Sequence, residues 1–314
     1  MGGLLQHELI MVTGKGGVGK TTLAAALALL SAERGARTIV VELGDQRRLP
    51  ELFGLGRGEP GVELELADRL FAMTLDPDRV LLEWVQELGG RIPGRVLAGS
   101  STFQYFAAAA PGAKELFAMV KVWELTQGRR WKRRARPYDV VILDAPATGH
   151  ALGLLRSPQT FGAIARVGPV AAQAERVREL LAAAGRSAYA AVAQGSEMAV
   201  SEAIELDQGL REALGRGLDL VIVNGLLPRR FSAAEMERIA ALDGGGGGRG
   251  RERVLLRAAA HAARSVHERA RLQHNQVARL RRRELEVASV PYLWGAPIDL
   301  EALRAVGHAI ERRV

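Results

Sequence analysis

Residues 9–34 read LIMVTGKGGVGKTTLAAALALLSAER, and the fold class follows from their pattern. The apolar run at 9–12 is typical of a buried parallel strand, and the glycine-rich turn after it leads into a run of strong helix formers that Gly35 closes. Residues 38–43 form the next apolar run and predict a second strand. The three segments therefore predict a βαβ unit with a right-handed crossover.

Further strands are expected at 71–75, 139–143 and 219–223, each short, apolar and bounded by turn or charged residues. Helical segments separate them, so the sequence predicts an α/β fold: a mostly parallel sheet flanked by helices, in one domain spanning 1–314. Two regions, 79–135 and 154–215, are rich in Ala, Leu, Glu and Arg, and we expect them to form a helical insert layer.

The C-terminal third adds a glycine-rich link at 244–248 and a basic helix at 250–283. Apolar or small residues recur along this helix at alternating spacings of three and four, as a packed helical face requires. This seam consists of Leu255, Ala259, Ala262, Val266, Ala270, Gln273, Val277 and Leu280.

The glycine-rich turn matches the phosphate-binding pattern G-x-x-x-x-G-K-[ST] from Gly14 to Thr21, between a predicted strand and a predicted helix. Its glycines let several backbone N–H groups point at phosphate oxygens, and the helix N-terminus adds positive potential. We expect Lys20 to reach the β- and γ-phosphates of ATP and Thr21 to coordinate Mg²⁺. The expected nucleotide contacts are Gly14, Lys15, Gly16, Gly17, Val18, Gly19, Lys20, Thr21 and Thr22.

Composition excludes several classes of protein. The chain has no cysteine, which removes disulfides, iron–sulfur clusters, thiolate zinc sites and a cysteine nucleophile. The longest apolar run, 23–30, is too short to span a membrane, and the first residues lack a signal core, so we expect a cytoplasmic protein.

The net charge of +8 is concentrated in residues 249–283, which contain eleven arginines and only two glutamates. Such a helix face is most often simply solvated, although nucleic acid, anionic lipid and an acidic partner remain open alternatives. No aromatic residue lies in this segment to stack on bases, and we expect no nucleic-acid partner.

Lys15, next to the first glycine, gives the loop a second lysine. GKGGVGKTT therefore resembles the deviant Walker A loop of dimeric ATPases: the arsenite-pump ATPase, the tail-anchored-protein targeting ATPase, the MinD and ParA positioning ATPases, and the nitrogenase iron protein. The resemblance implies a homodimer, or a heterodimer with a paralogue, that closes around ATP. It also implies that Lys15 contacts the phosphates bound by the other subunit.

Residues 138–150, YDVVILDAPATGH, narrow this resemblance to one branch. They place Asp144 at the end of a buried strand, where a carboxylate can hold Mg²⁺ through water. The segment is similar to the DTAPTGH switch of the arsenite-pump and tail-anchor ATPases, with APA in place of TAP. Four residues match that switch: Asp144, Thr148, Gly149 and His150.

Two later segments carry the same resemblance. LVIVNGLLP resembles the family's adenine-side segment, which implies that Asn224 hydrogen-bonds the base. VPYLWGAP resembles the last strand and its nucleotide-flanking loop, which implies that Pro291 lies beside the nucleotide. The chain is thus identified as a cysteine-free, bacterial-type member of the arsenite-pump and tail-anchor ATPase family.

The chain also departs from this family. Members usually carry an Asp-Pro first switch whose aspartate positions the attacking water, whereas residues 41–54 read VELGDQRRLPELFG. Glu42 and Asp45 are the candidates to substitute for it, and turnover is expected to be slow. Since As(III) is held by soft thiolates, a chain without cysteine is not expected to be an arsenite-pump subunit.

These observations favour an ATP-binding and ATP-hydrolysing dimeric switch that couples nucleotide state to a protein client or partner. One alternative is a positioning ATPase that acts on DNA or membrane through the basic helix. Another is a nucleotide-binding scaffold with slow turnover.

Overall fold

The structure is a computed structural model that describes residues 3–43, 48–89, 112–132, 134–164, 168–244, 250–295 and 297–314. Its strands are β1 (Leu9–Gly14), β2 (Thr38–Leu43), β3 (Leu64–Ala67), β4 (Leu70–Leu75), β5 (Val140–Asp144), β6 (Ser187–Gln194), β7 (Leu220–Leu226) and β8 (Val287–Pro291).

These strands form one sheet in the order β3-β4-β2-β5-β1-β6-β7-β8. All neighbouring pairs are parallel except β3–β4, an antiparallel pair at one edge. The mostly parallel α/β sheet that the sequence predicts is therefore confirmed. β1 lies at the centre, between β5 and β6, so the loop that follows it opens at the middle of the sheet.

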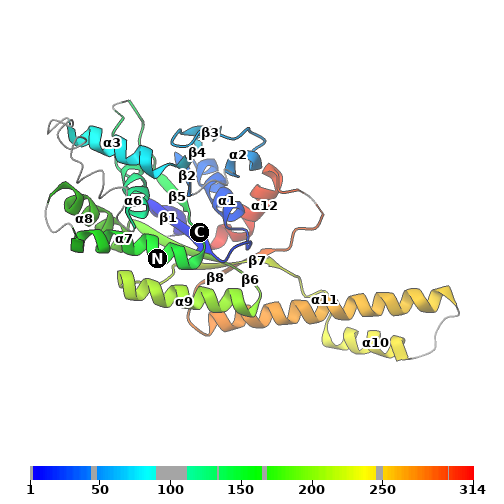
Figure 1. Cartoon of the computed structure of the whole chain (residues 1–314). Helices are drawn as coiled ribbons and strands as arrows, with labels where there is room; N and C mark the ends of the chain where they lie inside the picture. The colour runs from blue at the N-terminus through cyan, green and yellow to red at the C-terminus, as the bar shows by residue number, and fades with distance from the viewer. Residues whose placement is uncertain are drawn as a thin grey trace.

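The helices are numbered as in Figure 1, where the chain runs from blue to red. They are α1 (Lys20–Glu33), α2 (Leu49–Leu52), α3 (Pro77–Gly89), α6 (Ala113–Leu125), α7 (Thr148–Ile164), α8 (Pro169–Ala182), α9 (Glu197–Leu214), α10 (Ala233–Gly244), α11 (Arg251–Arg281) and α12 (Leu300–Ile310), with short 3₁₀ turns at Leu4–Gln6 and Glu311–Arg313. Among the described residues, no helix is both long enough and apolar enough to cross a membrane.

Helices cover both faces of the sheet because its central strands are apolar on both sides. Along β1, Leu9 and Met11 point to one face, while Ile10 and Val12 point to the other. α1, α2 and α12 pack on the face of Ile10, and α6, α7 and α8 pack on the face of Leu9 (Figure 1).

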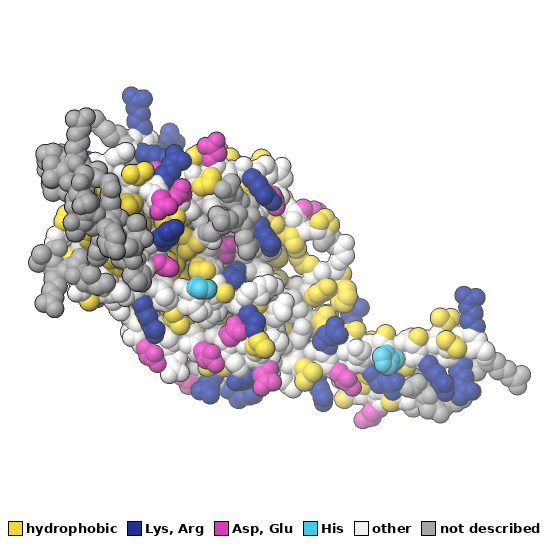
Figure 2. Space-filling view, viewed as in Figure 1, with side chains coloured by type: hydrophobic (Ala, Val, Ile, Leu, Met, Phe, Trp, Pro, Cys, Tyr) yellow, Lys and Arg dark blue, Asp and Glu magenta, His cyan; other side chains and the backbone are white. Residues whose placement is uncertain are grey.

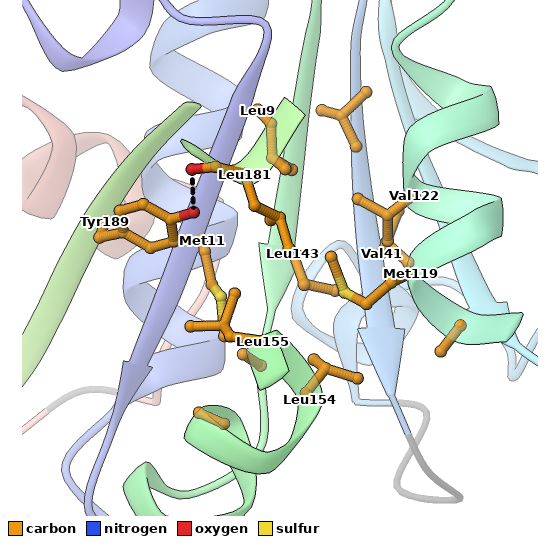
Figure 3. Packing of buried hydrophobic residues seen from close by; sticks show 14 of the residues in the cluster. Leu9, Met11, Val41, Met119, Val122, Leu143, Leu154, Leu155, Leu181 and Tyr189 are labelled. Carbon is orange, nitrogen blue, oxygen red and sulfur yellow. Dashed lines mark hydrogen bonds between the residues drawn. The ribbon is translucent and has the colours of Figure 1, made fainter. Parts of the chain in front are cut away.

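Figure 3 shows the core on the side of α6 and α7. Side chains from β1, β2 and β5 interdigitate there with those of the covering helices. Tyr189 of β6 reaches into this core, and its hydroxyl donates a 2.7 Å hydrogen bond to the carbonyl of Leu181 in α8 (Figure 3). The phenol is thus buried with its polar end satisfied.

β6 corrects one sequence-based expectation. The helical layer predicted over 154–215 does contain α7, α8 and α9, but residues 187–194 form a strand beside β1. Their sequence, SAYAAVAQ, is rich in alanine, which favours helices in isolation. The strand forms because it hydrogen-bonds to β1 on one side and to β7 on the other, and tertiary pairing outweighs intrinsic propensity.

α11 confirms the predicted basic helix but only half of its packed seam. Ala270, Val277 and Leu280 are buried, whereas Leu255 and Ala259 at the other end are exposed. Most of the predicted glycine-rich link lies outside the described residues. The helix is therefore anchored by its C-terminal half.

Candidate functional site

The carboxyl ends of the parallel strands meet at one edge of the sheet, and the phosphate-binding loop lies there between β1 and α1. Gly14 has φ +145°, and a Cβ at that position would stand 2.1 Å from the carbonyl oxygen of Val192 in β6. Gly19, at φ +96°, caps α1, and its Cβ would meet the Asn224 amide at 2.4 Å. Only glycine fits these two positions, so the sheet itself imposes the shape of the loop.

Lys20 and Thr21 begin α1 and face into the loop. The Lys20 ammonium donates a 3.2 Å hydrogen bond to the carbonyl of Lys15, which places it across the mouth of the loop. Burial lowers the pKa of Lys20 below its usual value, and the charge of Asp144 opposes this shift. A partly desolvated cation at a helix N-terminus is a strong site for a phosphate anion.

Asp144, at the end of β5, lies directly beside Thr21. The Thr21 hydroxyl donates a 2.6 Å hydrogen bond to Asp144 Oδ2, while Oδ1 is buried without a hydrogen-bond partner among the described residues. Burial raises the pKa of this carboxyl; the Thr21 hydrogen bond and the Lys20 charge only partly oppose the shift. An unsatisfied carboxylate oxygen next to a hydroxyl is a donor set that suits Mg²⁺.

Glu42 stands opposite Asp144 in the register of β2 and β5. It is buried, and its Oε1 accepts hydrogen bonds from the backbone N–H groups of Arg48, at 3.0 Å, and Leu49, at 3.3 Å. Burial raises the pKa of Glu42. Asp45, the other sequence-based candidate for the water-positioning residue, lies outside the described residues.

Lys15 is oriented differently from Lys20. Its ammonium forms a 2.8 Å ion pair with Glu202 of α9 and also contacts the sulfur of Met198. Both charged side chains of the pair are about one-third exposed, at 37% and 31%. Thus one lysine of the loop lies across its mouth, and the other is held on the surface of α9.

A cleft of about 920 Å³ adjoins the loop and continues between β7, β8 and α11. Asn224 lines it, and its side-chain amide donates a 2.8 Å hydrogen bond to the carbonyl of Val18. Pro291 lines the cleft as well, at the end of β8. The two residues that the resemblance assigned to the base are therefore brought to one cavity with the phosphate-binding loop.

Thr148, Gly149 and His150 form the first turn of α7, directly after the loop that follows Asp144. The Thr148 hydroxyl is buried without a partner among the described residues, whereas His150 is exposed. The Thr13 hydroxyl donates a 2.8 Å hydrogen bond to the carbonyl of Pro146, which ties this segment to β1. Residues 144–150, which resemble the family's DTAPTGH switch, thus lie against the strand that leads into the phosphate-binding loop.

Sequence reasoning missed several residues of the site. Tyr292 and Trp294 line the cleft as an edge-to-face aromatic pair with ring centroids 4.8 Å apart. Gln273 of α11 also lines it and accepts a 2.8 Å hydrogen bond from the backbone N–H of Leu227. The alternating aromatic residues in PYLW could have identified Tyr292 and Trp294 from the sequence. Nothing in the sequence around Gln273 or Glu202 indicates that these residues belong to the site.

Comparison with known proteins agrees with this geometry. Residues 7–168 match the family described as anion-transporting ATPase. The ATPase BagA of Mycobacterium tuberculosis is 30% identical over 241 residues, which cover 74% of this chain and 69% of that protein. A putative arsenical pump-driving ATPase of Halobacterium salinarum is 28% identical over 235 residues, which cover 70% and 35% of the two chains.

ATPase get3 of Schizosaccharomyces pombe is 29% identical over 149 residues, which cover 48% of this chain and 43% of that protein. The family match spans more than half of the chain and includes the phosphate-binding loop and the Asp144 switch. The chain is therefore an ATPase and belongs to the anion-transporting ATPase family.

Proposed function

We propose that this ATPase is a switch that closes as a pair of subunits around Mg·ATP and reopens after hydrolysis, coupling the two states to a protein client. The observation that carries the proposal is the different placement of the two loop lysines. The Lys20 ammonium hydrogen-bonds the carbonyl of Lys15 across the mouth of its own loop, whereas Lys15 is paired with Glu202 on the surface. A cation held outside its own cleft is available to a second subunit, which supports action across the interface.

The residues of the loop have separate roles in this proposal. The backbone of residues 14–19 and Lys20 would bind the phosphates, and Asn224 and Pro291 would bind the base. Thr21 and Asp144 would hold Mg²⁺, which when bound neutralises charge on the β- and γ-phosphates.

Glu42 or Asp45 would orient the attacking water. Because burial raises the pKa of Glu42, its carboxylate is a stronger base than an exposed glutamate. One of its oxygens already accepts hydrogen bonds from two backbone N–H groups, so it is less able to accept a proton from water. This supports slow turnover.

The client follows from the family only in outline. The chain has no cysteine, so it offers no thiolate with which to hold As(III). We therefore infer a protein client rather than an arsenical, and we treat residues 1–314 as one nucleotide-driven domain whose helical layer responds to closure.

Two alanine variants test the switch. Lys20→Ala should abolish ATP binding measured by calorimetry, because it removes the cation that faces the phosphates. Lys15→Ala should keep ATP binding but lose ATP-dependent pairing, measured by light scattering, and lose turnover at least tenfold.

Lys114→Ala, at an exposed position of α6, is the matched control and should behave as the wild-type protein. Full turnover by a strict monomer, or by the Lys15 variant, would contradict the switch. Unchanged ATP affinity of the Lys20 variant would contradict the phosphate assignment.

A further inference from the structure

α10 and α11 project from the body of the molecule as a helical hairpin (Figure 1). The N-terminal part of α11 is its outer end, and we call residues 251–264 the arm tip. Residues 251–259 are all exposed and Ala260 is buried, while the other buried positions, Ala270, Val277 and Leu280, lie nearer the sheet. Figure 2 shows apolar and basic side chains together on this projecting part.

The arm tip exposes three consecutive aliphatic side chains. Val254 is 66% exposed, Leu255 62% and Leu256 40%. Three successive helix positions turn through about 200°, so α10 cannot cover all of them from one side. A cluster of exposed aliphatics, unlike an isolated one, indicates an interaction surface.

The arm tip is also basic, with four arginines against one glutamate. Arg253 and Arg257 are four residues apart and lie on one side of the helix. Neither forms an ion pair with a carboxylate of the described residues. The chemistry that complements this surface is a face that is acidic and partly apolar.

α9 of the same chain has that chemistry. It contains five acidic residues against one arginine. Glu205 and Glu212, seven residues apart, are exposed on its outer side, where Glu212 also forms a long, exposed 3.9 Å ion pair with Arg156. Met198 on the same side is 62% exposed. Its first residue, Glu197, lines the nucleotide cleft, so the acidic face begins where the second subunit is expected to approach.

α11 and α9 meet at the C-terminal end of α11 and the N-terminal part of α9, and the two helices extend from there in opposite directions. Arg279 of α11 donates a 3.1 Å hydrogen bond to Ser201 of α9, next to the cleft. In Figure 1 both elements lie along the lower edge of the molecule, α9 toward the left and the arm toward the right. A two-fold axis through the region between them, perpendicular to the plane of Figure 1, would place the arm of each copy along α9 of the other.

We propose that the arm tip binds α9 of a second copy of this chain, so that each subunit of the closed pair clasps the other. This inference rests on the proposed function and adds to it the contact that holds the pair outside the nucleotide cleft. Arg253 and Arg257 face Glu205 and Glu212 in each of two equivalent contacts, and the exposed aliphatics of the tip pack near Met198.

Charge reversal tests the clasp. The arm variant Arg253→Glu/Arg257→Glu and the α9 variant Glu205→Arg/Glu212→Arg should each pair at least tenfold more weakly in Mg·ATP than the wild-type protein, because like charges then face each other. An equimolar mixture of the two variants should pair again, as heterodimers, since one contact is reversed and the other is native. Light scattering with one partner tagged measures both effects.

The control Lys114→Glu/Arg312→Glu makes the same change in net charge as the arm variant, at exposed positions outside the arm, and should pair as the wild-type protein. Circular dichroism melts establish that every variant is folded. Rescue in the mixture supports the clasp specifically, because no single-subunit effect produces it.

If the wild-type protein pairs and the arm variant pairs equally well, the clasp is wrong and the proposed switch stands. If the wild-type protein does not pair in Mg·ATP, the proposed switch fails together with the clasp. Binding of the wild-type protein to DNA or anionic vesicles that the arm variant loses, with pairing unchanged, would assign the arm tip to those partners instead and overturn the clasp.

Discussion

Lys15 and Glu202 form an ion pair whose partners both remain in contact with water. Pairs of this exposure contribute about 0–1 kcal/mol, much less than the attraction between a lysine and a triphosphate in a partly buried site. The pair orients Lys15 in the subunit and is weak enough that, in the proposed switch, the nucleotide of a second subunit would break it. In the proposed switch, Glu202 would compete with the phosphates of the partner for the ammonium group of Lys15.

Glu202→Gln should therefore strengthen ATP-dependent pairing by about two- to fivefold, because the competing carboxylate is removed at a gain of roughly 0.5–1 kcal/mol. Sedimentation velocity over a range of protein concentrations measures the dissociation constant of the pair. Glu65→Gln, at an exposed position of β3, is the control and should leave this constant unchanged. Weaker pairing of the Glu202 variant would mean that Glu202 supports the closed state rather than competing with it.

At the scale of the element, α6 is held by charges that the nucleotide site does not use. Lys121 and Glu124 are 3.0 Å apart, and Arg130 donates a 2.7 Å hydrogen bond from Nε to Glu124; all three side chains are buried. Arg130 also binds Glu63, at 2.7 Å, and the hydroxyl of Tyr138 donates to the same carboxylate at 2.6 Å. This network fastens α6 to the edge of the sheet that contains β3.

The network predicts a specific pH dependence of the free energy of unfolding. Burial by itself raises the pKa of Glu124, but the charge of Lys121 and the hydrogen bond from Arg130 outweigh it, so the net pKa lies below the ordinary 4.5. A carboxyl whose pKa is lower in the folded than in the unfolded state stabilises the fold at pH values above its unfolded pKa. This stabilisation is lost as the pH falls through its folded pKa. We expect the free energy of unfolding to fall with pH below about 4.5 in part through this residue.

Glu124→Gln should destabilise the protein by about 3–5 kcal/mol at pH 7, because it leaves Lys121 and Arg130 buried with less compensating charge. It should also make the acid limb of stability shallower, since one depressed carboxyl no longer titrates. Urea unfolding between pH 3 and pH 7 measures both effects. Glu115→Gln on the exposed side of α6 should cost no more than about 0.5 kcal/mol, and an equal loss there would contradict the role of the network.

The elements differ in how far the sequence predicts them. β2 lies at 38–43 as expected, and α1 follows the phosphate loop, because in both places apolar period, turn residues and helix formers agree locally. β6 is not predictable in this way: an alanine-rich strand buried on both faces has no alternation, and only its pairing with β1 and β7 identifies it. The sequence also does not predict that one end of α11 is exposed. A helical seam shows which face of the helix is apolar, but not whether another part of the molecule covers that face.

At the scale of the molecule, the residues of the site also divide into those that the sequence predicts and those that only the fold identifies. Lys20, Thr21 and Asp144 are predictable because each belongs to a short motif at a strand end, and strand ends of a parallel sheet meet. Glu202, Gln273 and Trp294 reach the site from separate elements, and only the sheet order and the crossing of α11 bring them there. The cleft thus joins the phosphate loop to the base of the helix that carries the arm.

This arrangement predicts that nucleotide binding orders α11 as well as the loop. Gln273 and Arg269 of α11 line the cleft together with Asn224 and the segment around Trp294, so a nucleotide bound in the proposed position would contact both sides of the cleft. A ligand present at 100 times its dissociation constant stabilises the native state by about 2.7 kcal/mol, and local opening of contacted segments is suppressed with it. Mg·ATP should therefore slow amide hydrogen exchange at residues 14–22, 194–197, 265–276 and 291–294.

The prediction is tested by hydrogen exchange with mass spectrometry, with and without Mg·ATP, in the wild-type protein and in Lys20→Ala. The variant should show none of the protection, because it cannot hold the phosphates, and β3–β4 at the far edge of the sheet should exchange equally in every sample. Protection confined to residues 14–22 would mean that the base does not reach α11. Protection of 265–276 in a Lys15→Ala protein that binds ATP without pairing would show that α11 responds to the nucleotide of its own subunit, and so that the arm is set by binding before the second copy arrives.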